Sequence, residues 1–168
     1  MARATQLGLV MAMVAGCGKG GGGSRPKLTA ELLPPAAQPL MLVTSGEADV
    51  MGKVSAPEVT KDKAFGGESS NTFNDHPLIT IKDGESYYEL WTMGDGPPKL
   101  GRISLRGEGC AWVNEHIATL DGSRNCPGNR KTGPSGSTGY YCLTADNGHV
   151  VHVECSENMI QYWVSDKT

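Results

Sequence analysis

In the second half of the chain, short runs that alternate apolar and polar residues are separated by dipeptides typical of tight turns. Both dipeptides, Asp-Gly and Asn-Gly, tolerate the positive φ angles that two-residue hairpin loops require. Each lies between two runs of strand-like period, so the pattern predicts two β-hairpins. The hairpins comprise Leu78 to Lys82 with Ser86 to Met93 around Asp83-Gly84, and Thr138 to Asp146 with His149 to Cys155 around Asn147-Gly148.

Two more runs have the same period, Leu100 to Arg106 and Met159 to Ser165. The stretch Ala111 to Leu120 fits both a strand and a short amphipathic helix, and its all-β surroundings favour the strand. Residues 77–168 thus hold about six or seven strands joined mostly by short loops. We expect an all-β (mainly β) fold, a small antiparallel barrel or sandwich.

Four cysteines lie in this β-rich part: Cys110, Cys126, Cys142 and Cys155. They form no CxxC pair and lack the spacing of zinc ligands, so no metal site is predicted. If the chain is exported, an even number of cysteines in such a small domain is typical of disulfides. We therefore expect two disulfide bonds that reinforce a limited core.

The hairpin register bears on how these cysteines pair. A two-residue turn at Asn147-Gly148 places Cys142 opposite Val153, one diagonal step from Cys155, which is too far for a comfortable bond. A longer loop would align the two, so this pair is disfavoured but stays open. The preferred pairing joins Cys126 to Cys142 and Cys110 to Cys155.

The N-terminus carries Arg3, an apolar run from Leu7, and then Val14-Ala15-Gly16-Cys17. The run is about half of the roughly 20 residues that span a bilayer, so it is no ordinary anchor. Its order of a basic residue, an apolar stretch and small residues resembles the lipobox of bacterial lipoprotein signal peptides. The resemblance implies that residues 1–16 are removed as a signal peptide.

The same resemblance implies that Cys17 becomes the N-terminus and carries a diacylglyceryl thioether and a further acyl chain, such as palmitate. Several acyl chains give stable membrane anchoring. Gly18 stands where an aspartate retains such proteins in the inner membrane, which favours the outer membrane. We expect a lipid-anchored protein of the bacterial cell envelope, with its domain in the periplasm or at the surface.

Residues 17–39 are rich in glycine and proline and predict a flexible linker behind the lipid. Residues 40–76 are mostly polar and predict irregular structure, with one short strand at Leu40 to Thr44 as an alternative. The disulfide-stabilised β domain is then expected in residues 77–168, beginning near Leu78, with Leu40 to Val54 docking on it as an open alternative.

The formal net charge of −3 comes without a basic stripe, which argues against nucleic acid as a partner. No residues fit a catalytic set, and no cofactor is implied. His149 and His152 are expected at the surface of their hairpin, on opposite faces of a strand. Gly133-Pro134-Ser135-Gly136 lacks the last glycine of a GxSxG elbow and the strand-to-helix turn around it.

The aromatic residues are concentrated in the β-rich part, where adjacent pairs such as Tyr140-Tyr141 and Tyr162-Trp163 must split between two faces. One member of each pair could stack on a glycan or peptide, but ordinary sheet packing is the favoured explanation. The anchor, the disulfides and the lack of a catalytic set favour a non-enzymatic binding or scaffolding domain whose partner is an envelope protein or glycan.

Two alternatives stay open. Ser135-Gly136 upstream of Tyr140-Tyr141 resembles the Ser-Gly loop of membrane-bound lysozyme inhibitors, which are small lipidated β-barrels, although spacing and chain order depart from that family. That resemblance implies an inhibitor of a hydrolase. The other alternative is an enzyme whose site is assembled from residues distant in the sequence.

Overall fold

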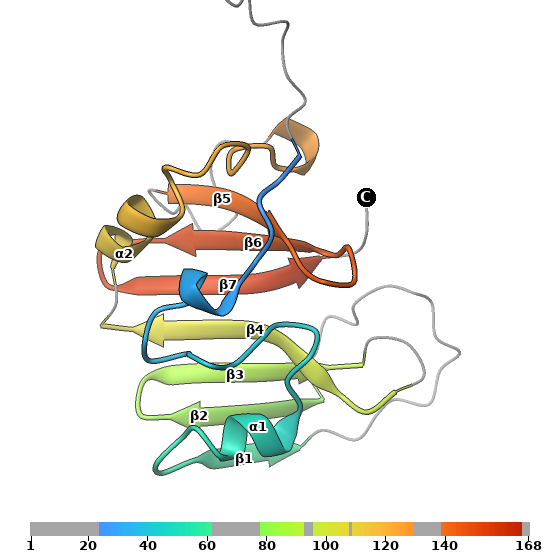
Figure 1. Ribbon diagram of the computed structural model, residues 1–168. Helices are drawn as coiled ribbons and strands as arrows, with labels where there is room; N and C mark the ends of the chain where they lie inside the picture. The colour runs from blue at the N-terminus through green and yellow to red at the C-terminus, as the bar shows by residue number, and fades with distance from the viewer. Residues whose placement is uncertain (1–23, 62–77, 93–95, 108, 130–138, 166–168) are drawn as a thin grey trace, which may run out of the picture.

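A computed structural model describes residues 24–61, 78–92, 96–107, 109–129 and 139–165. Their main feature is one antiparallel sheet of seven strands, which confirms the predicted all-β class (Figure 1). The strands are β1 (Glu58–Lys61), β2 (Ile79–Asp83), β3 (Ser86–Trp91), β4 (Lys99–Arg106), β5 (Gly139–Thr144), β6 (Val150–Cys155) and β7 (Met159–Ser165).

The strand order is β1-β2-β3-β4-β7-β6-β5, so two meanders meet where β4 pairs with β7. The sheet is open rather than closed into a barrel, because β1 and β5 form its two edges and do not pair with each other. The sequence did not distinguish a barrel from a sandwich. The structure has a single sheet whose apolar face is covered by coil and short helices (Figure 1).

The first predicted hairpin is confirmed. Asp83 pairs with Ser86, which leaves Gly84 and Glu85 as a two-residue loop. Gly84 has φ 61°, a conformation that glycine adopts without strain and that a hairpin with glycine at its first central position requires. The turn chemistry thus fixes the register between β2 and β3.

The second hairpin is also present, but its register differs by one residue from the prediction. Ala145 N–H donates to the His149 carbonyl at 2.9 Å, so the loop has three residues and Gly148 has φ 83°. Cys142 therefore lies opposite His152 rather than Val153. A shift of one residue turns side chains to the other face, and Cys142 and Cys155 project from opposite faces of the sheet.

This register explains the disulfides, which have the preferred pairing. Cys110 bonds to Cys155 across 45 positions, and Cys126 bonds to Cys142 across 16. Because Cys142 and Cys155 face apart, neither can reach the other. The prediction of two disulfides with this connectivity is confirmed.

The favoured strand at Ala111 to Leu120 is wrong, because Cys110–His116 forms helix α2. Val113 lies in α2 and Ile117 directly follows the last residue of the helix. The two side chains project from the same side and are fully buried in the core. The helical spacing of the apolar residues therefore indicated the conformation of this stretch better than its all-β surroundings did. The helix lies beside one end of β5, β6 and β7 (Figure 1).

We call residues 24–57 the N-terminal segment. Its first part, residues 24–39, is packed on the sheet, which contradicts the flexible linker predicted there. It passes over the apolar face of the sheet and supplies much of the core (Figure 1). Its short elements are the 3-10 helix η1 (Ala30–Leu32) and the helix α1 (Glu47–Met51). Its fully buried apolar residues are Leu28, Leu33, Ala37, Leu40, Leu42 and Val50.

The boundaries expected from the sequence change accordingly. The alternative strand at Leu40 to Thr44 is wrong, because Leu40 and Met41 lie in coil and Leu42 to Thr44 in a turn. Strand β1 forms within the region predicted as irregular. The core does not begin near Leu78, because Leu28 and Leu33 already belong to it. The alternative that Leu40 to Val54 docks on the sheet is confirmed, since Leu40, Leu42 and Val50 are buried in the same core. Residues 1–23, which include Cys17, lie outside the described residues.

The outer edge of β5 is occupied by other parts of the chain. Lys27 forms a parallel bridge with Thr144, with Leu28 N–H donating to Thr144 O at 2.8 Å. Farther along, Cys142 N–H donates to Ser123 O at 2.7 Å. An edge strand whose backbone groups are bonded in this way offers less to a second sheet.

Candidate functional site

The two faces of the sheet differ in chemistry. The face toward the N-terminal segment is apolar, whereas the other carries polar and aromatic side chains at in-register positions. We call it the polar face. Two cross-strand rows form it, Tyr87–Ser104–Gln161–Glu154–Tyr140 and Glu89–Arg102–Trp163–His152–Cys142.

His152 is at the centre of the most densely connected part of this face. Its Nδ1 lies 2.6 Å from Tyr140 Oη, and its Nε2 lies 2.8 Å from Ser165 Oγ. The Trp163 ring stacks on the imidazole at 5.1 Å between centroids and 15° between planes. His152 is 7% exposed and Tyr140 2% exposed, whereas Trp163 is half-buried. The prediction that His152 lies at the surface is therefore wrong.

Both ring nitrogens of His152 contact hydroxyl groups, Nδ1 that of Tyr140 and Nε2 that of Ser165. Because a hydroxyl group can donate or accept, these two contacts satisfy either neutral tautomer of the imidazole.

The Cys126–Cys142 disulfide packs on the same cluster. Cys142 and Cys126 are buried with Tyr140 and Val150, and Trp163 lies against them. Cys142 Sγ is 3.5 Å from His152 Nδ1. The cluster thus combines a disulfide, an imidazole and two large aromatic rings.

Polar side chains continue the face beyond Trp163 toward β4 and β3. Gln161 Nε2 donates to Ser104 Oγ at 3.2 Å, and Arg102 pairs with Glu89 at 3.1 Å. Arg102 lies directly opposite Trp163 in the register of β4 and β7. The half-buried Trp163 is therefore bordered by hydrogen-bonding groups.

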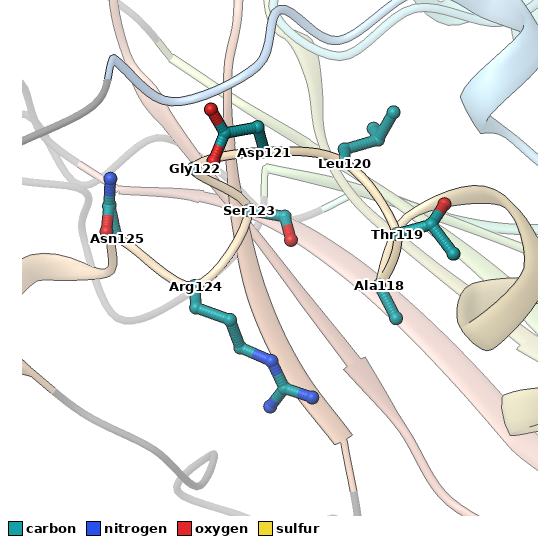
Figure 2. Close-up of a pocket in the computed structure, with 8 residues that line it drawn as sticks. All are labelled: Ala118, Thr119, Leu120, Asp121, Gly122, Ser123, Arg124 and Asn125. Atoms are coloured by element: carbon teal, nitrogen blue, oxygen red, sulfur yellow. The ribbon is translucent and has the colours of Figure 1, made fainter. Parts of the chain in front are cut away.

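A second candidate is the open pocket along residues 118–125. Figure 2 shows its lining as one continuous loop, with Arg124 and Asp121 extending to opposite sides. The Arg124 guanidinium lies 4.2 Å from the centre of the Tyr141 ring and donates to its hydroxyl at 2.9 Å. The lining of this pocket comes from a single loop, whereas the polar face combines side chains from five strands, which makes the polar face the better candidate.

Several sequence-derived residues can now be placed. The four disulfide cysteines are brought together in pairs, as expected. His149 is half-buried in the loop between β5 and β6, and the next residue, Val150, packs in the cluster with Cys126 and Cys142. Cys17 and the Ser135-Gly136 pair lie outside the described residues.

Sequence reasoning missed the cluster around His152. Its members come from three strands, and their meeting depends on a register that the turn prediction had wrong by one residue. The available signal was the alternation in β5, β6 and β7, which puts one residue of each aromatic pair on the polar face.

Within the ranges that the structure describes, no group of three or more His, Cys, Asp or Glu is arranged to hold a metal ion. Of the helices in these same ranges, none has the length and apolar character needed to cross a bilayer. The chain matches no family model, and no curated protein or solved structure shows significant similarity to it.

Proposed function

We propose that the chain is a lipid-anchored protein of the bacterial envelope whose β domain binds a glycan through the polar face. Support for export and anchoring comes from the lipobox-like segment that ends at Cys17. Two disulfides are typical of proteins that fold in oxidising compartments.

The observation that carries the binding proposal is the setting of Trp163. Its ring is half-buried and is supported from one side by His152, so it is held in one orientation. Sugar rings have apolar faces that stack on aromatic rings and hydroxyl groups that need hydrogen-bonding partners. Gln161, Arg102 and Glu89 supply such partners on the same face.

Rigidity favours this use of Trp163. A side chain that is already ordered loses little conformational freedom on binding, so more of the contact energy appears as affinity. The stack of Tyr140, His152 and Trp163, with centroid separations of 5.7 and 5.1 Å, provides this order.

Glycan binding is tested with the full chain purified in detergent and mixed with peptidoglycan sacculi or, separately, lipopolysaccharide vesicles. We expect retention on one of them, a loss of at least about tenfold in affinity for Trp163→Ala, and a smaller loss for Trp163→Phe, which keeps a ring.

Met51→Ala is the matched control, because Met51 is an exposed apolar residue, 38% accessible, on the covered side of the sheet. It should bind like the wild type. A wild type retained on neither glycan, or a folded Trp163→Ala variant with unchanged affinity, contradicts the proposal.

Anchoring is tested by fractionation of cells that express the full chain or Cys17→Ser. The wild type should enter the membrane fraction with an acylated Cys17 in its mass spectrum, and the variant should lose both properties. An intact Met1 with an unmodified Cys17 would exclude the lipoprotein assignment.

A further inference from the structure

The loop between β5 and β6 contains Asn147-Gly148, the only Asn-Gly pair in the chain. Asp146, Asn147 and Gly148 are all exposed. Gly148 has φ 83° and no side chain, so no Cβ atom of its own crowds its backbone nitrogen. A side-chain amide and the next backbone nitrogen can react with each other, because the bond between them closes a five-membered ring.

Hydrogen bonds in the loop hold the two reacting groups of this pair close together. His149 N–H donates to Asn147 Oδ1 at 3.2 Å, so the Asn147 side chain is folded along the backbone of Gly148. Gly148 N–H donates to Ala145 O at 2.9 Å. This second bond lies along the N–H direction, in the peptide plane, whereas the nitrogen attacks a carbonyl carbon through its face.

The bond from His149 also favours the reaction electronically. When a nucleophile attacks Asn147 Cγ, negative charge develops on Asn147 Oδ1. A donor that already points at such an oxygen stabilises the charge without further rearrangement. His149 N–H has this position before the reaction begins.

Asn114, Asn125 and Asn158 are exposed as well and provide a comparison within the same chain. Each of them is followed by a residue with a Cβ atom, which crowds the attacking nitrogen and limits the backbone angles available for ring closure. Asn114 also lies within helix α2, whose backbone hydrogen bonds restrict it further. Exposure alone therefore does not distinguish Asn147 from these residues, but its neighbour does.

We propose that Asn147-Gly148 is a self-modification site, at which the folded protein converts Asn147 into isoaspartate. Gly148 N loses its proton to water and attacks Asn147 Cγ. The new N–C bond forms, the bond from Cγ to the side-chain nitrogen breaks, and that nitrogen takes up a proton and leaves as ammonia. Water then opens the ring, at the main-chain carbonyl to give isoaspartate or at Cγ to give aspartate. One water is consumed, one ammonia is released, and no electrons are exchanged.

The product alters the loop that joins β5 to β6. In isoaspartate the main chain runs through the former side chain, which adds one backbone carbon to the three-residue loop. A new carboxylate also appears beside Asp146, which pairs with Lys27 Nζ at 2.7 Å. Because loop length and register are coupled in a hairpin, we expect the converted protein to be less stable.

The test incubates the full chain under native conditions and follows every asparagine by peptide mapping, with isoaspartate detected by enzymatic methylation. Asn147 should convert at least about tenfold faster than Asn114, Asn125 and Asn158, a difference of about 1.4 kcal/mol in the barrier. Gly148→Ala should slow the conversion about tenfold or more, because a Cβ atom then crowds the nitrogen. If this variant does not fold at the positive φ, the ranking within the wild type decides.

Asn147→Asp is the matched control for the product, because it adds the charge without the extra backbone carbon. The isoaspartate fraction, separated by ion exchange, should melt at a lower temperature than Asn147→Asp, and equal melting temperatures would refute the effect on the loop. Conversion of Asn147 no faster than that of the other three asparagines overturns the proposal. So does an Asn147 that stays intact in the folded chain while the same chain in urea is converted.

Discussion

Gly101 shows how a single residue shapes the sheet. Leu90 pairs with Leu100 and Glu89 with Arg102, so Gly101 is the extra residue of a bulge in β4. A Cβ atom built on Gly101 would collide with the indole ring of Trp91, which is 9% exposed. The missing side chain is what allows Trp91 to lie against the backbone of the neighbouring strand.

We expect Gly101→Ala to reduce the free energy of unfolding by about 1–3 kcal/mol, because the Trp91 ring must move from its packed position. Urea denaturation followed by circular dichroism measures the change. Gly96→Ala is the matched control, since no atom lies within 4 Å of its added Cβ and its φ is not positive. Equal losses for the two variants would contradict this account.

The cluster around His152 could not be predicted at the level of residues. Asn147-Gly148 correctly indicated a hairpin, but a two-residue and a three-residue loop place opposite faces of β6 against β5. The preferred disulfide pairing was right, yet the deciding reason is that Cys142 and Cys155 face apart, not that they lie diagonally.

At the level of elements, the N-terminal segment is the main surprise. Its buried leucines follow neither a period of two nor one of 3.6, and prolines interrupt them, so no pattern marks them as core. They are buried because the apolar face of the sheet needs a cover. By contrast, the strands β2 to β7 follow from alternation and turn dipeptides, and their predicted limits are close to the observed ones.

Replacement of Leu33 by alanine should reduce the free energy of unfolding by about 2–5 kcal/mol, as in other fully buried sites. Leu33 is 0% exposed and lies in the core cluster, which a flexible linker would not explain. Chemical denaturation of the full chain tests this. Met51→Ala, at an exposed position of α1, should change the stability by no more than about 0.5 kcal/mol. A Leu33→Ala variant as stable as the wild type would restore the linker interpretation.

For the molecule as a whole, the two meanders are held together by the pairing of β4 with β7 and by the Cys110–Cys155 bond. This bond links α2, which follows β4, to the end of β6, and it closes 45 positions of chain. The Cys126–Cys142 bond closes only 16. In the chain-entropy account, a longer closed loop gives the larger restriction of the unfolded state.

Removal of the longer bond by Cys110→Ala with Cys155→Ala should cost about 4 kcal/mol, and removal of Cys126–Cys142 by the corresponding alanines about 3 kcal/mol. Thermal and urea unfolding of the two double variants provide both values. A larger loss for the Cys126–Cys142 variant would show that native contacts, not loop length, set the order.

The position of β7 has a consequence for the time at which this protein can fold. β7 is the farthest along the described chain, yet it lies in the middle of the sheet between β4 and β6. Tyr162 of β7 also donates to the carbonyl of Leu32, 130 positions earlier. Because loop-closure entropy must be overcome before such distant contacts form, we expect the two meanders to stay separate until β7 has been synthesised. A nascent chain of this order remains open for most of its synthesis, which fits the proposal that it crosses a membrane before the sheet and its disulfides are complete.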